Sequence, residues 1–186
     1  MSKLIVVIDM QNDFIDGSLG SEAAQLIVPK AIAAIKHYGN SDNSICATLD
    51  THGDDYLNTL EGKLLPVPHC IIGTEGTQLN NAVAHAIVDN FTSEFTYISS
   101  KETFGYNWFG DRMWFREEKF DEIIIFGLCT DICVVSNALI LRAACPNTPI
   151  KCLAYCCAGT TPDAHEAALK VMESCQIEVI KEEGKY

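Results

Sequence analysis

Apolar residues recur along this chain with two different periods, and each period predicts one kind of secondary structure. Short, nearly continuous apolar runs are typical of strands that are buried on both faces. Six such runs predict strands at residues 3–9, 44–50, 95–99, 123–126, 150–154 and 177–180. Several segments between them carry apolar residues at three- and four-residue spacing, which predicts amphipathic helices. These helices cover residues 22–37, 77–89, a segment ending at Leu141, and 163–175, with a possible short helix ending near Lys119.

Strand and helix alternate, which predicts an α/β fold with a parallel sheet and helices on both of its faces. Local signals support the helix boundaries. Thr161 can cap the last helix and Pro162 suits its first position, while Thr130 or Asp131 can cap the helix after the fourth strand. Residues 51–76 are rich in glycine and proline and predict a loop, and a loop of this length is usually functional.

Chemically capable side chains stand at the carboxyl ends of the first four predicted strands. In chain order they are Asp9, Asp50, Lys101 and a strand-to-helix turn that contains Cys129 and Cys133. Ligands of parallel α/β sheets bind outside these ends, at the point where the strand order reverses. The pattern therefore predicts a site that these side chains share.

A cysteine at a strand-to-helix turn can serve as a nucleophile, because the helix dipole and free backbone N–H groups lower a thiol pKa and can hold an oxyanion. Asp9 could take the thiol proton, and Lys101 could stabilise the resulting anion. The alternative is that Cys129 and Cys133 are ordinary buried thiols, Asp9 a turn carboxylate and Lys101 a solvated surface lysine.

A second group of polar residues predicts a metal site. Asp50 and His52 stand two residues apart at a strand end, so an extended backbone can project both to one side. His69 and Glu61 can complete a set of oxygen and imidazole ligands, which suits zinc first, and also manganese or iron. The alternative is that the two histidines are loop residues hydrogen-bonded to backbone.

Composition narrows the class of protein. The chain has 186 residues, of which 48% are hydrophobic and 20% charged, and this favours one soluble domain over residues 1–186. A net charge of -12 argues against a nucleic-acid partner. Nine cysteines without a CxxC pair, no cleavable leader and no apolar run near membrane-spanning length together predict a cytoplasmic protein with no membrane association.

Three segments in this order, VIDMQNDF, SKETFGYN and GLCTDICV, resemble the isochorismatase-like cysteine hydrolase superfamily. The resemblance extends to AGTTPDAHEAALKVM and so covers nearly the whole chain. It implies a three-layer α/β/α sandwich with a six-stranded, mainly parallel sheet in the order 3-2-1-4-5-6. It also implies a catalytic triad of Asp9, Lys101 and Cys133. A non-proline cis peptide between Leu128 and Cys129 would direct the backbone N–H groups of Cys129 and Cys133 into an oxyanion hole.

Within this superfamily, LDTH and PVPHCIIGTEG are similar to the nicotinamidases and pyrazinamidases. The resemblance implies that Asp50, His52 and His69 bind a metal ion that holds the substrate's pyridine nitrogen. Glu61 matches the glutamate ligand of one bacterial subgroup. The chain departs from the group pattern in lacking a further histidine between the two segments.

The chain also lacks the aromatic residue that often precedes the second segment, where Leu65-Pro66-Val67 stands instead. Phe14, together with Phe104 or Tyr106, is expected to wall the substrate pocket. The expected reaction converts nicotinamide to nicotinate and ammonia through a thioester on Cys133.

Two alternatives stay open. One is a cysteine hydrolase of another small amide, and the other is a non-catalytic binding relative, against which the intact triad argues. A small-molecule amide is the expected partner, and a homo-oligomer the expected assembly.

Overall fold

A six-stranded sheet forms the centre of the computed structural model, which describes residues 2–92, 96–110 and 120–184. The strands are β1 (Lys3–Ile8), β2 (Ser44–Asp50), β3 (Thr96–Lys101), β4 (Glu122–Leu128), β5 (Ile150–Ala158) and β6 (Glu178–Ile180). Their order in the sheet is β3-β2-β1-β4-β5-β6, and all neighbours pair in parallel. All six predicted strands are present, although β5 continues beyond the predicted end at residue 154, and the strand order that the family resemblance implies is confirmed.

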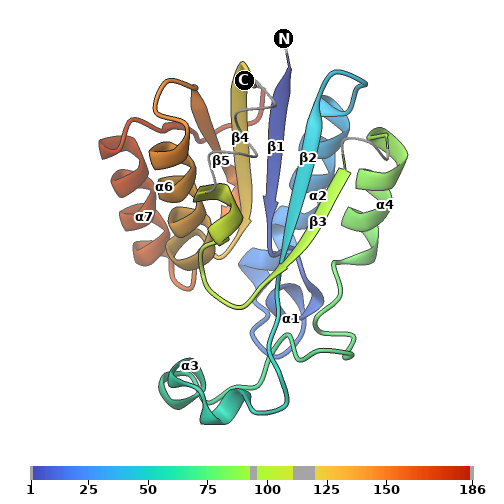
Figure 1. The fold of residues 1–186 in the computed structure, drawn as a ribbon, viewed down its shortest axis with the longest axis vertical. Coiled ribbons are helices and arrows are strands. Elements are labelled where there is room, and N and C mark those ends of the chain that lie inside the picture. The colour runs from blue at the N-terminus through green and yellow to red at the C-terminus, as the bar shows by residue number, and fades with distance from the viewer. Residues whose placement is uncertain (1, 93–95, 111–119, 185–186) are drawn as a thin grey trace.

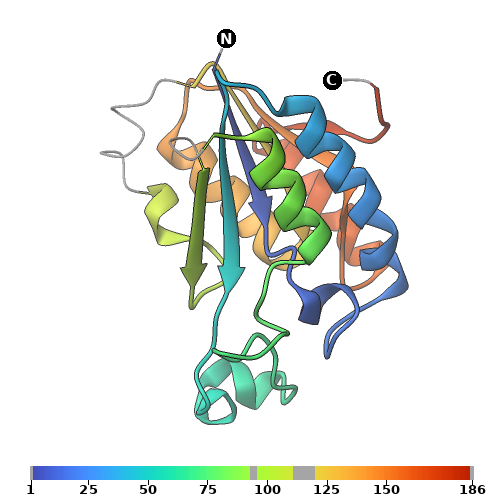
Figure 2. The same ribbon diagram turned by 90° about the vertical axis from the view of Figure 1, so that its right-hand side faces the viewer.

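Helices cover both faces of the sheet (Figures 1 and 2). α2 and α4 pack on one face, and α6 and α7 on the other. The helices are α1 (Asn12–Ile15), α2 (Glu22–Tyr38), α3 (Leu60–Leu64), α4 (Asn81–Asn90), α6 (Val135–Ala144) and α7 (Pro162–Ser174). Shorter turns are the 3-10 segments η1 (Tyr56–Asn58) and η3 (Asn107–Gly110) and the π-helical turn η4 (Thr130–Val134).

The long helices follow the sequence pattern closely, with informative differences at their ends. α4 starts at Asn81, later than expected, because the Asn80 side chain caps it by accepting a hydrogen bond from the Ala82 N–H. Residues 51–76, expected to be a loop, contain η1 and α3. The short helix expected before Lys119 lies outside the described residues.

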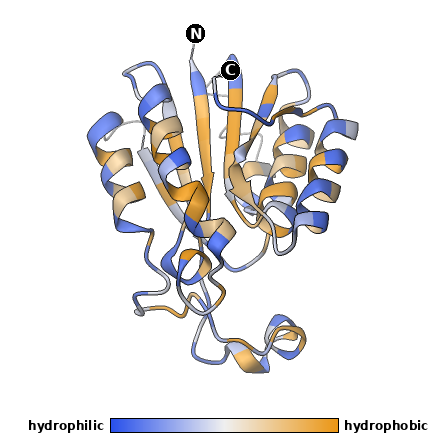
Figure 3. Cartoon of the chain, turned by 180° about the vertical axis from the view of Figure 1, so that it is seen from behind, coloured by the Kyte–Doolittle hydropathy of each residue, from blue (hydrophilic) through white to orange (hydrophobic). Residues whose placement is uncertain are grey.

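The core consists of the central strands and the apolar sides of the helices, as the hydropathy colouring of Figure 3 shows. Leu4 to Ile8 of β1 and Ile123 to Phe126 of β4 are completely inaccessible to solvent. All nine cysteines are free thiols, and six of them are buried. In the described part of the chain, no helix has both the length and the apolar character needed to cross a bilayer.

The strand order reverses between β1 and β4, and a glycine allows these strands to approach closely. Gly127 has a φ of +135°, and a Cβ atom there would lie 2.0 Å from the Ile8 carbonyl oxygen. The segments that follow the two strands therefore leave the sheet side by side. Asp9 and the turn after Leu128 consequently meet at the same edge.

Candidate active site

The carboxyl ends of β1, β3 and β4 bring three reactive side chains into one buried cluster. The Lys101 Nζ atom lies 2.7 Å from Oδ2 of Asp9 and 3.7 Å from Sγ of Cys133. All three residues are buried. The structure thus places an acid, a cation and a thiol in mutual reach, as the strand-end pattern predicted.

Thr48 of β2 fixes the orientation of Asp9. Its hydroxyl donates a hydrogen bond of 2.7 Å to Oδ1 of Asp9, and its carbonyl oxygen accepts one of 3.2 Å from the Asp9 N–H. Asp9 has a φ of +47°, a left-handed conformation that non-glycine residues seldom adopt. Its carboxylate is therefore held in position by the surrounding structure rather than by local preference.

Burial and charge set the protonation of this cluster. Burial, and next the negative charge of Asp9, raise the pKa of the Cys133 thiol well above its usual value. Burial likewise raises the pKa of Asp9, although Lys101 opposes this. Burial acts to lower the pKa of Lys101, but the charges of Asp9, Cys133 and Asp50 outweigh it and raise the pKa. The resting site therefore holds a neutral thiol and a charged lysine, and Asp9 is a stronger base than an exposed aspartate.

The turn that carries Cys133 is a single π-helical turn rather than a capped α-helix. The Cys129 carbonyl oxygen accepts hydrogen bonds from the N–H groups of Ile132, at 3.1 Å, and Val134, at 3.0 Å. The Leu128–Cys129 peptide is cis, as the family resemblance implies.

Neither Thr130 nor Asp131 caps this helix, so that expectation is wrong. Both side chains instead contact the segment after β5. The Thr130 hydroxyl lies 2.8 Å from Nδ1 of His165, and the Asp131 carboxylate accepts a hydrogen bond of 2.8 Å from the Thr160 N–H. These contacts tie the Cys133 turn to the beginning of α7.

Asn137 is a positioning residue that the sequence reasoning missed. It is fully buried, and its amide donates hydrogen bonds to the carbonyl oxygens of Cys133, at 2.7 Å, and Phe104, at 3.1 Å. Its Oδ1 accepts a hydrogen bond of 2.6 Å from the Tyr106 N–H. An asparagine four residues after Cys133, in a mostly apolar segment, was the available signal.

Four potential metal ligands meet beside this cluster. One ligand atom from each of Asp50, His52, Glu61 and His69 lies within 4.8 Å of all the others. Nε2 of His52 is 2.9 Å and Nε2 of His69 is 3.5 Å from Oδ2 of Asp50. Oε1 of Glu61 is 3.8 Å from the first of these nitrogens and 3.7 Å from the second.

The donor set fits a divalent cation. The Val67 carbonyl oxygen lies 2.8 Å from Nδ1 of His69, so this nitrogen carries the proton and Nε2 presents a lone pair to the cluster. Two imidazole nitrogens and two carboxylates that point at one another repel unless a cation or protons lie between them. Nitrogen and oxygen donors without a thiolate suit zinc, manganese or iron.

The long loop positions two of these ligands through structure that sequence patterns did not reveal. The Thr59 hydroxyl caps α3 by accepting a hydrogen bond of 3.0 Å from the Gly62 N–H, which places Glu61 in the first turn. Tyr56, which is buried, packs its ring 4.7 Å from that of His52 and 5.0 Å from that of His69. Tyr56 thus supports both histidines.

Gln11 is a further residue that the sequence reasoning missed, and its side chain holds the backbone of Asp50. Its side-chain amide donates to the Asp50 carbonyl oxygen at 2.8 Å and to the Thr77 carbonyl oxygen at 2.7 Å. Its Oε1 accepts a hydrogen bond of 2.7 Å from the Asp50 N–H. The completely buried amide extends the pairing of β1 with β2 beyond the end of β1.

Asp50 also joins the two clusters. While Oδ2 faces the histidines, Oδ1 lies 3.2 Å from Nζ of Lys101. The candidate metal site and the Asp9, Lys101 and Cys133 group are therefore parts of one continuous polar centre.

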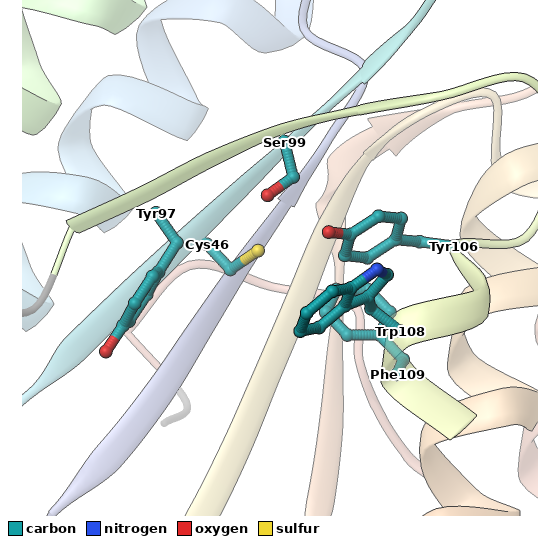
Figure 4. Close-up of a pocket in the computed structure, with 6 residues that line it drawn as sticks. All are labelled: Cys46, Tyr97, Ser99, Tyr106, Trp108 and Phe109. Atoms are coloured by element: carbon teal, nitrogen blue, oxygen red, sulfur yellow. The ribbon is translucent and has the colours of Figure 1, made fainter. Parts of the chain in front are cut away.

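This centre opens into a cavity of about 740 Å³. Phe14 and Phe104 line it together with Cys129 and Cys133, as expected for pocket walls. Tyr106 does not line it, and its placement there has to be corrected. Its ring packs edge-on against Phe109, at 5.0 Å, and borders a separate hollow over β2 and β3 (Figure 4).

Comparison with known proteins agrees with this geometry. The isochorismatase domain family matches residues 3–183. A nicotinamidase/pyrazinamidase of Mycobacterium tuberculosis (strain ATCC 25618 / H37Rv) is 26% identical over 196 residues, which cover 96% of this chain and 98% of that protein. The crystal structure of nicotinamidase/pyrazinamidase PncA from Bacillus subtilis has a TM-score of 0.83 and 27% identity, covering 97% of this chain and 100% of the other.

A more distant structure, the pyrazinamidase of Pyrococcus horikoshii in complex with zinc, shares the fold with a TM-score of 0.76 at 23% identity. It covers 97% of this chain and 99% of the other. The sheet order, the polar centre at its reversal point and the match over residues 3–183 agree, and the chain belongs to the isochorismatase family.

Proposed function

We propose that this protein is a metal-dependent cysteine amidohydrolase that converts nicotinamide to nicotinate and ammonia. The enzyme is a hydrolase of an amide C–N bond, as its nicotinamidase relatives are. The observation that carries the proposal is the contact of Lys101 with Asp9, Cys133 and Asp50, because it joins a nucleophile to a metal-ligand cluster facing the same cavity.

In the first half of the reaction, the Cys133 thiol gives its proton to Asp9 and its sulfur attacks the amide carbon. The resulting oxyanion accepts hydrogen bonds from the backbone N–H groups of Cys129 and Cys133. The C–N bond then breaks, and Asp9 passes the proton to the departing nitrogen, which leaves as ammonia. Lys101 stays charged throughout and stabilises the anionic forms of both partners.

In the second half, a water molecule attacks the thioester carbon while Asp9 takes one of its protons. The bond between sulfur and carbon breaks, and the proton returns from Asp9 to the Cys133 sulfur. The acid leaves and the resting site is restored. The raised pKa of Asp9 suits this exchange, since the carboxyl must both accept and release a proton.

Asp50, His52, Glu61 and His69 would hold one divalent ion, with zinc the first choice for this nitrogen and oxygen set. When bound, such an ion supplies a Lewis acid that can anchor a pyridine nitrogen. The residues themselves fix where the ring of the substrate lies, because Asp50 contacts Lys101 beside the nucleophile. The amide is thereby directed at Cys133.

Ammonia release from nicotinamide and from benzamide, which lacks the ring nitrogen, tests the proposal when combined with metal analysis of the purified protein. We expect faster turnover of nicotinamide, and loss of this preference after chelation. A metal-free preparation, made without chelator, that hydrolyses nicotinamide at full rate would refute the metal's role. Preference for an amide without a ring nitrogen would favour another small-amide hydrolase, and an unreactive Cys133 would favour a non-catalytic relative.

The expected cytoplasmic location and homo-oligomeric assembly accompany this proposal. Cell fractionation tests the first and light scattering of the purified protein tests the second.

A further inference from the structure

A group of exposed leucines forms one side of the active-site cavity. We call this group the leucine wall; it consists of Leu60, Leu64 and Leu65. The three residues belong to α3 and its C-terminal end, and all of them line the cavity. Leu60 is 75% exposed and Leu64 79% exposed, which is unusual for leucine. α3 projects from the carboxyl end of the sheet (Figures 1 and 3). The leucine wall therefore has little protein packed over it within the described chain.

The direction of the leucine wall is fixed by polar contacts. Glu61, between the leucines, reaches toward His52 and His69. Leu60 and Leu64 are four residues apart and share one side of the helical turn. The Tyr56 hydroxyl donates a hydrogen bond of 2.9 Å to the Leu65 carbonyl oxygen, which anchors the end of α3.

The rest of the cavity is also mostly apolar. Phe14, Leu19 and Ala24 come from α1, the following loop and α2, whereas Leu128 precedes the turn that carries Cys133 and Ile132 lies within it. The polar groups of the reaction contact one another and so occupy one region of the lining. A ligand that reaches the nucleophile thus meets polar groups around its amide and ring nitrogen, and apolar groups beyond them.

The size of the cavity exceeds what a single-ring amide needs. Its volume of about 740 Å³ lies in the range of sites that enclose drug-sized ligands. Nicotinamide bound at the polar centre would leave much of the leucine wall in water. An additional apolar group on the substrate would cover it, and removing this surface from water favours binding.

We infer that the preferred substrates are pyridine carboxamides that carry a further apolar group, such as a fused second ring, packed against Leu60 and Leu64. The inference rests on the proposed function for the reaction itself and adds the class of substrate. It assigns Leu60 and Leu64 as specificity-determining residues.

The test compares kcat/KM for nicotinamide with that for quinoline-3-carboxamide, which keeps the ring nitrogen and the amide and adds a fused benzene ring. The variants are Leu60→Gln combined with Leu64→Gln, and Leu57→Gln as a matched control. Leu57 is 51% exposed in the same loop but does not line the cavity. Glutamine keeps the side-chain length and the helix propensity of leucine. Metal content is measured in each protein, because it reports whether α3 still presents Glu61.

We expect the wild type to prefer the quinoline amide by roughly tenfold, the discrimination that a well-filled apolar pocket supplies. The double variant should lose this preference through a higher KM, and Leu57→Gln should keep it. Turnover of nicotinamide without turnover of the quinoline amide would overturn the inference and leave the proposed function intact. A double variant that retains both its metal and the preference would overturn it as well.

Two further measurements separate the remaining outcomes. If the wild type hydrolyses neither amide, the proposed function fails, and binding of quinoline-3-carboxamide, measured by calorimetry, then tests the inference by itself. Binding that is weaker in the double variant than in the wild type supports the inference. Binding that is absent, or equal in both proteins, overturns it. Light scattering of the double variant tests whether a second copy covers the leucine wall. An oligomer that dissociates on this substitution would assign these leucines to a subunit contact instead.

Discussion

Replacing Lys101 by methionine keeps the length of the side chain but removes the cation that Asp9 and Asp50 share. Both carboxylates are buried, and they lie 2.7 Å and 3.2 Å from the Lys101 Nζ atom. Removing one partner of a buried ion pair typically costs ~3–5 kcal/mol, because an uncompensated charge stays behind. For a chain of this size, such a loss lowers the melting temperature by roughly 10 °C.

The loss of stability in Lys101→Met should depend on pH in a defined direction. Without Lys101, burial and the charge of Asp50 raise the pKa of Asp9 further above its value in the unfolded chain. A carboxyl whose pKa is raised in the folded state supplies stability at low pH and loses it as the pH rises through the folded-state pKa. The stability deficit of Lys101→Met is therefore largest at neutral pH and above, and it shrinks as the pH falls toward ~4, the unfolded-state value.

Urea unfolding followed by circular dichroism between pH 5 and 8 measures this deficit. Chelator is present throughout, so that a bound cation cannot replace the lysine beside Asp50. Lys181→Met is the control, because Lys181 pairs with Glu166 at 3.0 Å on the exposed surface and should have little effect. A Lys101→Met protein as stable as the wild type at pH 8, or one whose deficit grows on acidification, would show that Lys101 does not neutralise buried carboxylates.

Four further substitutions test other parts of the site. Cys133→Ala should abolish ammonia release with an unchanged unfolding midpoint. Cys129→Ala should keep most activity, because only the backbone N–H of Cys129 is used. The opposite pattern would exchange the roles of the two cysteines. His52→Ala should lower bound metal and raise the KM for nicotinamide while Cys133 still reacts with iodoacetamide, and loss of alkylation would contradict this separation. Gln11→Leu leaves buried backbone groups of Asp50 unpaired. It should lower the free energy of unfolding in urea by ~1–3 kcal/mol and weaken metal retention. A variant as stable as the wild type with full metal content would refute the positioning role of Gln11.

The sequence by itself determined the architecture and the members of the polar centre. Strands buried on both faces of a parallel sheet must be apolar along their whole length, so they stand out in the pattern. The carboxyl ends of parallel strands lie at one edge, so the sequence alone groups Asp9, Asp50, Lys101 and the cysteine turn. Local chemistry was sufficient here because each signal lies within one strand or one turn.

Only the tertiary structure decided which partners those side chains have. Gln11 contacts Asp50 across 39 residues, and Thr130 contacts His165 across 35 residues. No local pattern predicts such pairs, and local signals alone therefore favour Thr130 or Asp131 as a helix cap. Tyr106 points to another hollow because the Asn137 amide and Phe109 hold its segment.

Contacts that no local pattern reveals also explain why α3 forms. Residues 60–64 are too few to form a helix from their own propensity, and the Thr59 cap and the Tyr56 contact supply what the sequence window lacks. Whether Glu61 reaches the histidines, and whether Leu60 and Leu64 face the cavity, follows from that docking. The length of the loop at residues 51–76 indicated a functional segment, but its conformation depends on contacts with the rest of the fold.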